Sequence, residues 1–448
     1  MTKIKNSLKT INYKMFFALL MFGLIPTLYM TVRIYLIGQL PNTYSFSIAG
    51  QLQWVSLFYE VLQEALILPL FYFIGAVLTN REALINRIRS GLLFTFIAYT
   101  TLSFLIILFA RPLVVFMAQD SSIVTETVNY IRLETISMIF STLVKYLIVV
   151  LVTLKRDKNL YILLIVQLVL TIIFDFFFMS TYSFSLNLGV NGMPITNMIV
   201  NLLSFVVLIV ILYKNDLPIF NSFKLDFSWF KELFKKGGLS GLESLIRNVA
   251  FMLMIVRMVN VVGEQGTFWV ANNFIWGWLL LPVLQLGELI KSDCAEEKFI
   301  AVKNKSLGYF NLTLIFIILW GVTLPLWEPF MKHVLQISNY KDVLYIVLIS
   351  VGFYVLFAIN NVVDSIFYGL GKINLMLLQS IVVNSIYYGT AFILFQLGVF
   401  QPNLTLIALM FAIGTAFDSI LTMVLYFIML KKENINIFDF EIAMWKYL

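Results

Sequence analysis

The sequence has few of the residues that cover a water-soluble protein or hold a metal. Charged side chains make up 12% of the 448 residues, whereas about 25% is typical of soluble domains. The single cysteine, Cys294, excludes an internal disulfide and a cysteine zinc cluster, and the single histidine, His333, cannot build a metal site. No serine or cysteine nucleophile stands near a histidine in the sequence. We therefore expect no metal, no other cofactor and no enzyme active site.

The chain is instead rich in apolar residues, and 60% of its residues are hydrophobic. A helix that spans a bilayer needs about 20 apolar residues, and the hydrophobic runs are of that length. We therefore predict an all-α integral membrane protein. The predicted spans are 15–37, 46–76, 89–109, 126–153, 159–181, 189–213, 237–262, 266–290, 306–330, 341–369, 373–397 and 403–430.

Lysine and arginine are concentrated in alternate loops between these spans. Basic loops mark the cytoplasmic side of a membrane protein, and the N-terminal segment, the central loop and the C-terminal segment are all basic. We therefore expect a multi-pass membrane protein with both termini in the cytoplasm. The high content of Ile, Lys and Asn indicates an AT-rich bacterial genome, so the expected location is the bacterial cytoplasmic membrane. The formal charge of +7 is explained by these loops, so we expect no nucleic-acid partner.

The chain also repeats itself. Tyr130-Ile131 opens one long apolar run and Tyr345-Ile346 opens a similar run about 215 residues later, while Trp54 recurs as Trp276. Repeats of this kind build carriers whose binding site lies between two bundles. We predict two six-helix bundles related by an axis along the membrane normal. The predicted domains are an N-lobe at 1–213, a cytoplasmic linker at 214–236 and a C-lobe at 237–448. The linker is expected to form an amphipathic helix on the cytoplasmic membrane interface, and the alternative is an ordinary linker.

Several charged side chains fall inside the predicted spans. Each costs roughly 2.5–3.5 kcal/mol at the centre of a membrane helix, so each is expected to face a partner or a wet cavity. Arg132 and Glu134 are expected to reach the outer interface from the end of the fourth span. The basic residues are Arg33, Arg132, Lys145, Arg247 and Arg257, and the acidic ones are Glu60, Glu64, Glu134, Asp175, Glu243, Asp364 and Asp418.

Glu60 and Glu64 form the sharpest acidic pair. They are four residues apart, so they share one face of the second span near its middle. Two close carboxylates in a medium of low dielectric do not both ionise readily, and one is therefore expected to hold a proton near neutral pH. This arrangement suits proton coupling or the binding of a cationic ligand. The alternative is that Arg33 or Lys145 neutralises them.

Two further polar groups are candidates in the second half. Glu243 and Arg247 are four residues apart on the seventh span, which favours a local ion pair. Asn360, Asn361 and Asp364 form a polar patch on the tenth span. This patch is expected to line a cavity, and the alternative is that it bonds one helix to another.

The order of several short segments resembles the multidrug and toxic compound extrusion (MATE) transporters, over essentially the whole chain. That family consists of twelve-span exporters and is related to flippases of polysaccharides and lipid-linked oligosaccharides. The segments that carry the resemblance are Val32–Gly38, Phe174–Asp175, Leu188–Thr196, Gly238–Ser244 and Asp364–Lys372.

The sequence departs from the family at its cation sites. Arg33 stands where the family usually has an aspartate of an N-lobe cation or proton site. Asp175 retains the fifth-span acid, Thr171 stands where the family often has asparagine, and Thr196 matches a family hydroxyl. Asn248 lies near the position of a C-lobe glutamate in some members.

These departures lead to a specific hypothesis about coupling. We expect Arg33 to pair with Asp175 and to stand in for the bound cation, because an unpaired charge there is costly. Sodium is then not expected at this site. Coupling would use H+ and would move to Glu60 and Glu64, or to Glu243 and Asp364.

The resemblance implies a monomeric exporter of small organic, cationic and amphipathic molecules, driven by an H+ or Na+ gradient and surrounded by lipid. The five basic residues within the spans leave one alternative open, a flippase or exporter of a lipid-linked or anionic metabolite. The substitution of both cation-site acids of the family leaves another, a degenerate carrier that no longer transports and serves as a membrane binding partner.

Overall fold

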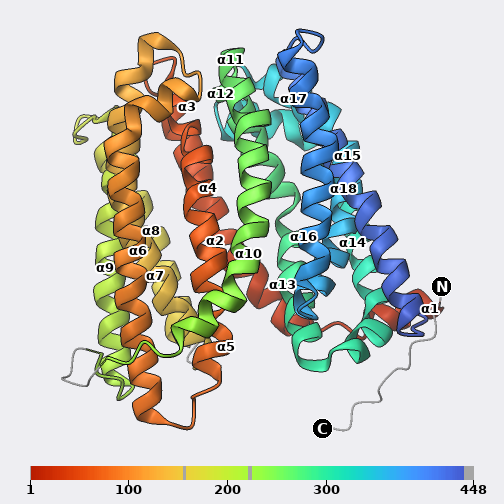
Figure 1. The fold of residues 1–448 in the computed structure, drawn as a ribbon. Helices are drawn as coiled ribbons and strands as arrows, with labels where there is room; N and C mark the ends of the chain where they lie inside the picture. Colours follow the sequence, from red (N-terminus) through yellow and green to blue (C-terminus); the bar gives the residue numbers. More distant parts are fainter. Residues whose placement is uncertain (1, 155–157, 220–224, 438–448) are drawn as a thin grey trace. The chain divides into compact units, whose positions relative to one another are not determined.

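The protein is helical throughout the residues that the computed structural model describes, which are 2–154, 158–219 and 225–437 (Figure 1). No strand occurs in these ranges. Within them, 10 helices are long and apolar enough to cross a membrane, or 11 if one bent pair is counted as a single span. The predicted all-α membrane class is confirmed.

The second predicted span, 46–76, is broken into several short helices. These are α3 (Ser45–Gly50), α4 (Leu52–Leu62), the π-turn η1 (Gln63–Ile67) and α5 (Leu70–Gly75). The break after η1 falls at Pro69, which has no backbone N–H to donate to the preceding turn. This interruption explains why the segment does not count as one continuous span.

The eighth predicted span, 266–290, is bent by 55° between Leu279 and Leu281. It consists of α12 (Gln265–Phe274), the π-turn η5 (Ile275–Leu279) and α13 (Leu281–Glu297). Pro282 lies in the first turn of α13, where proline starts a helix well but cannot continue the one before it.

The remaining elements follow the predicted spans closely. They are α1 (Thr2–Leu8), α2 (Tyr13–Gly38), α6 (Arg81–Phe116), η2 (Ser121–Ile123), α7 (Val124–Thr153), α8 (Lys158–Met179), η3 (Gly189–Asn191), α9 (Gly192–Lys214), α10 (Phe230–Phe251), η4 (Met252–Val256), α11 (Arg257–Val261), α14 (Phe299–Pro329), η6 (Phe330–Val334), α15 (Tyr340–Gly369), α16 (Ile373–Val382), η7 (Val383–Tyr388), α17 (Gly389–Gln396) and α18 (Leu404–Lys432).

The internal repeat is visible in helix lengths. Helices α7 and α15, which contain the repeated Tyr-Ile pair, each have 30 residues. The helix before each of them also matches, because Arg81–Phe116 and Phe299–Val334 both have 36 residues. The duplication therefore extends from short sequence matches to the plan of the helices.

The helices pack as two compact units. One comprises Met1–Thr27 with Val270–Leu448, and the other comprises Leu28–Trp269. The unit Leu28–Trp269 thus holds α10 and α11 as well as the helices from α3 to α9. The predicted lobes, 1–213 and 237–448, divide the chain at its central linker, and this division stays a prediction.

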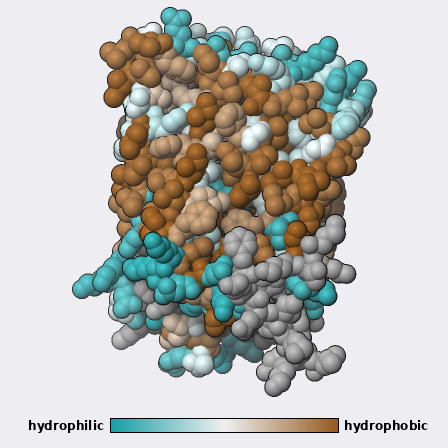
Figure 2. Space-filling view, turned by 90° about the vertical axis from the view of Figure 1, so that its right-hand side faces the viewer, coloured by the Kyte–Doolittle hydropathy of each residue, from teal (hydrophilic) through white to brown (hydrophobic). Residues whose placement is uncertain are grey.

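The outer surface is apolar over a broad band. Figure 2 shows hydrophobic residues covering the middle of one face, with hydrophilic residues gathered toward its two ends. Ile318, Val322 and Leu326 follow each other at intervals of four along α14, and all three side chains are largely exposed. A stripe of this kind matches lipid rather than water.

The central linker is only partly described, because 220–224 lie outside the described residues. Phe230 to Lys236 forms the start of α10 rather than a separate helix. Trp229, just before it, is buried and donates its indole N–H to Ser90 Oγ at 3.1 Å. This tryptophan therefore packs on α6, not in the lipid interface.

Helix α10 approaches η1 closely through glycine. A Cβ on Gly237 would meet the backbone carbonyl of Ala65, and one on Gly241 would lie 2.8 Å from the Ala65 Cβ. Small residues spaced by four allow two membrane helices to come into backbone contact. The neighbouring Gly238 faces open space.

We predict that Gly237→Ala lowers stability by about 1–3 kcal/mol, because the added methyl group overlaps backbone that cannot rotate away. Gly238→Ala is the matched control and should be neutral or slightly stabilising. The midpoint of thermal unfolding in detergent, followed by size-exclusion chromatography, measures both. Equal midpoints for the two variants would contradict the close approach.

Candidate functional site

A buried ion pair joins α2 to α8. Arg33 Nε donates to Asp175 Oδ2 at 2.7 Å, and its Nη2 donates to Oδ1 at 3.3 Å. The two side chains are 4% and 0% exposed. Such two-pronged contacts suit the planar guanidinium, which presents parallel donors to both carboxylate oxygens. The predicted pairing of Arg33 with Asp175 is confirmed.

The pair continues into a longer chain of polar groups. Arg33 Nη2 also donates to Asn197 Oδ1 at 2.6 Å. Asn197 Nδ2 in turn donates to both oxygens of Glu134, at 2.9 and 3.1 Å. Four side chains from α2, α7, α8 and α9 are thus linked without a break, and we call Arg33, Asp175, Asn197 and Glu134 the arginine cluster.

The expectation for Glu134 was wrong. It does not reach the outer interface but is 4% exposed and enclosed by the unit. Its position on α7 lies ten residues from Val124, or about 15 Å along the helix, which is too deep for a short carboxyl to reach water. Arg132 is exposed and donates to the Ile107 carbonyl at 3.4 Å, and its reach to the outer interface stays a prediction.

Two threonines lie beside the arginine cluster in sequence. Thr171 is one turn before Asp175 on α8 and is buried. Thr196 immediately precedes Asn197 on α9, and its fully buried hydroxyl has no hydrogen-bond partner among the described residues. Asn197 itself escaped sequence reasoning, although it directly follows the motif segment that ends at Thr196.

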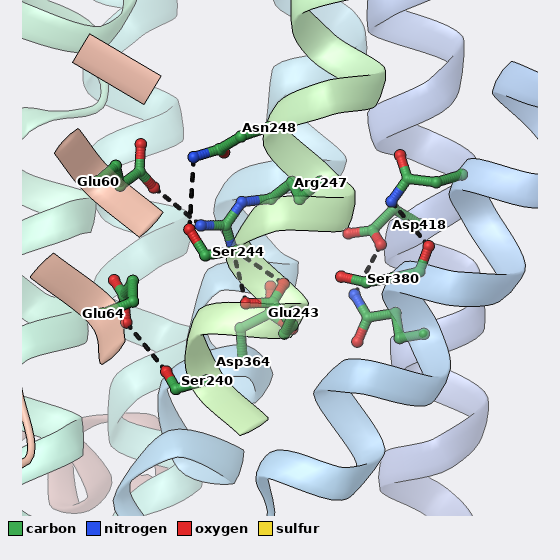
Figure 3. Close-up of polar contacts among 12 residues, drawn as sticks. Glu60, Glu64, Ser240, Glu243, Ser244, Arg247, Asn248, Asp364, Ser380 and Asp418 are labelled. Atoms are coloured by element: carbon green, nitrogen blue, oxygen red, sulfur yellow. Dashed lines mark hydrogen bonds and ion pairs between the residues drawn. The ribbon is translucent and has the colours of Figure 1, made fainter. Parts of the chain in front are cut away.

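A second polar centre lies between α10 on one side and α4 with η1 on the other. All three elements belong to the unit Leu28–Trp269. Arg247 Nη2 contacts Glu60 Oε1 at 2.8 Å, and its Nη1 contacts Glu243 Oε1 at 3.0 Å. Figure 3 shows Arg247 between these two carboxylates. The predicted pair of Glu243 with Arg247 is therefore present, and it extends to Glu60.

The cation that neutralises the acidic pair of the second span is thus Arg247. Neither Arg33 nor Lys145 does so by contact, because Arg33 is held by Asp175 and Lys145 Nζ donates to Gln63 Oε1 at 3.2 Å. Sequence reasoning missed this partner because Arg247 is far away in the chain. Glu64 accepts from Ser240 Oγ at 3.2 Å.

These contacts form an antiparallel ladder. Asn248 Nδ2 donates to the Leu57 carbonyl at 3.1 Å, and Asn260 bonds with Gln51 nearer the other end of the helices. The residue numbers run in opposite directions on the two sides of the ladder. They rise along α10 and α11, and those of the bonded partners fall along η1, α4 and the segment that precedes α4. The ladder rungs are Ser240–Glu64, Arg247–Glu60, Asn248–Leu57 and Asn260–Gln51.

The candidates of the tenth span belong to the other unit. Asn360 Nδ2 donates to Asp364 Oδ2 at 2.9 Å, along α15 itself. Asn361 Nδ2 donates to the Val283 carbonyl of α13 at 3.0 Å. For Asn361, helix–helix bonding is therefore present where a cavity-lining position was expected.

A double-mutant cycle measures how much the contact between Arg33 and Asp175 contributes to the free energy of unfolding. Arg33→Ala and Asp175→Ala should each cost about 3–5 kcal/mol, because each leaves one buried charge without its partner. The double variant should be clearly more stable than the sum of the two losses predicts. Thermal unfolding midpoints measure the cycle, with exposed Arg132→Ala as the control. Additive losses would mean that the pair contributes nothing.

Comparison with known proteins gives matches among structures alone. No protein-family model matches the sequence, and no curated protein matches it significantly. A structure described as the inward-facing conformation of a multidrug resistance MATE family transporter of the MOP superfamily has a TM-score of 0.75 at 16% identity, covering 91% of this chain and 95% of that one.

Two other structures agree. A point mutant of the Vibrio cholerae MATE transporter VcmN has a TM-score of 0.71 at 16% identity, covering 97% of this chain and 99% of that one. An outward-facing multidrug resistance MATE family transporter has a TM-score of 0.67 at 16% identity, with 95% of each chain covered. The chain therefore has the fold of the MATE family transporters, as the resemblance in its sequence predicts.

Proposed function

We propose that this multi-pass membrane protein is a secondary active transporter that exports organic cations by alternating access, driven by a proton gradient. The MATE fold over nearly the whole chain supports the transport class. The basic loops support a place in the bacterial cytoplasmic membrane with both termini in the cytoplasm. A single chain carries both repeats, which suits a monomer.

The observation that carries the coupling proposal is the contact of Arg33 with Asp175. Both carboxylate oxygens of Asp175 accept from the guanidinium, so the position where the family resemblance places a cation already holds one. A sodium ion would need these oxygens as ligands and would be repelled by the nearby guanidinium. Proton coupling has no such requirement for a set of free oxygen ligands.

The ladder of α4 and α10 supports a cationic substrate. Glu60 and Arg247 are each about two-fifths exposed, at 39% and 40% of the side chain. A pair that water reaches is weak and exchangeable, because solvent screens its attraction. A cationic substrate that approaches this site therefore competes with Arg247 for the Glu60 carboxylate, while Glu64 next to it is bonded to the neutral Ser240 hydroxyl. Aromatic side chains would add cation–π contacts to such a substrate.

Transport by the purified protein in proteoliposomes tests the coupling. We expect an imposed pH gradient to drive ethidium across the membrane, because the proton is the driving ion. A sodium gradient at equal pH should give no more than liposomes without protein. Sodium-driven transport without a pH gradient would overturn the proposal that H+ is coupled, and no transport under either gradient would favour a binding role without transport.

The role of the acidic pair is tested by Glu60→Gln/Glu64→Gln. We expect transport of ethidium to fall by about tenfold or more, because both carboxylates that attract the cation are lost. Glu232→Gln removes an exposed acid of α10 and is the control. Full activity of the double variant, with the protein inserted at normal levels, would refute a role for this pair.

A further inference from the structure

We infer that Glu134 is the carboxyl that takes up and releases the coupled proton, and that Arg33 holds it in place through Asn197. This inference rests on the proposed proton-driven transport, and it assigns the proton to a residue of the arginine cluster rather than to the ladder of α4 and α10.

Asn197 is held in one orientation by Arg33. Its carbonyl oxygen accepts from Arg33 Nη2 at 2.6 Å, and a guanidinium can only donate. The amide is therefore fixed with its NH2 group on the opposite side, where it meets both oxygens of Glu134 at 2.9 and 3.1 Å. Arg33 thus sets which atoms face Glu134 without touching it.

The two acids of the arginine cluster differ in their partners. Asp175 has a cation against both of its oxygens. Glu134 is 4% exposed, and within the described ranges no basic side chain lies within 4.0 Å of it. A buried carboxylate that is bonded only to a neutral amide carries an uncompensated charge, which is expensive in a medium of low dielectric. A proton is the smallest species that removes this cost.

The surroundings provide partners for the protonated form. Tyr130 lies one turn before Glu134 on α7 and Ser137 lies almost one turn after it. Both hydroxyls, like that of Thr196, are buried and have no hydrogen-bond partner in the part of the chain that the structure describes. A protonated carboxyl gains a donor, and these hydroxyl oxygens are acceptors on the neighbouring helical turns.

Charged and titratable groups on α2, α4, α7 and α8 interact with Glu134. They are Tyr29 and Arg33 on α2, Tyr59 on α4, Tyr130 on α7 itself and Asp175 on α8. Arg33 and Asp175 compensate each other, so a change in charge of the cluster is confined to Glu134.

Proton uptake then alters the link between helices. The ionised carboxylate accepts two N–H···O contacts from Asn197, whereas the neutral acid keeps one carbonyl acceptor and turns its O–H into a donor. Uptake adds one H+ to one oxygen of Glu134, and release restores the carboxylate, with no other covalent bond made or broken. The connection of α7 to α9, and through Asn197 to α2, is therefore different in the two states.

Infrared difference spectroscopy of the purified full-length protein tests the assignment without transport. We expect a carbonyl band of a protonated carboxylic acid that appears on acidification and is absent in Glu134→Gln. Glu134→Asp should keep a titrating band at a shifted frequency. Glu126→Gln, which removes an exposed acid of the same helix that accepts from Asn42, should leave the band unchanged. A band unaffected by both changes at Glu134 overturns the inference.

Transport separates the inference from the function on which it rests. In Glu134→Gln we expect ethidium transport driven by a pH gradient to fall at least about tenfold, while equilibrium exchange without a gradient continues and no longer depends on pH. Equal loss of both activities, with a lowered unfolding midpoint, would show a purely structural role and overturn the inference.

The remaining outcomes are also distinct. Undiminished proton-driven transport in Glu134→Gln would overturn the inference and leave the proposed function standing. A wild-type protein that shows the titrating band but no proton-driven transport would overturn the proposed function, and with it the coupling role of Glu134, while the site of protonation would stand.

Discussion

The cost of an unpaired charge away from water is the constraint that organises the interior of this protein. It explains why Arg33 is matched to Asp175 across two helices and why both are almost completely enclosed. A lone cation at that depth would cost several kcal/mol, and so would a lone anion. The pair fixes the relative positions of α2 and α8, and it also fixes the amide of Asn197, on which the environment of Glu134 depends.

The same constraint has a different result where charged side chains are exposed. Arg247 serves two carboxylates at once, and Glu60 and Arg247 both keep substantial exposure. The exposed pair of Glu60 with Arg247 contributes little to stability, whereas the Glu243 side chain is only 3% exposed. The close packing of Gly237 and Gly241 on Ala65 adds backbone contact between the same helices.

Much of this plan is readable from the sequence, and the reason differs from residue to residue. Apolar runs and basic loops predict the helices because the bilayer imposes one length and one polarity on every span. The pairing of Arg33 with Asp175 is predictable because Arg33 stands where the resembled family usually has an aspartate, so a positive charge replaces a negative one next to the retained acid. The contact of Arg247 with Glu243 is predictable because the two residues are four apart on one helix. Its contact with Glu60 and the contact of Glu134 with Asn197 are not, since these partners are remote in the chain and no spacing links them. Pro69, which breaks the second span, is a signal that counting apolar residues overlooks.

The packing of α10 on the earlier helices bears on how the duplicated chain is inherited and assembled. A ribosome completes the first six predicted spans before α10 emerges, and until then Glu60 lacks its cation and Ala65 lacks the glycine face that covers it. The first repeat therefore lacks contacts that only one helix of the second repeat supplies. The two halves are alike in plan, yet a gene split at the central linker would separate partners that the folded protein keeps in one compact unit.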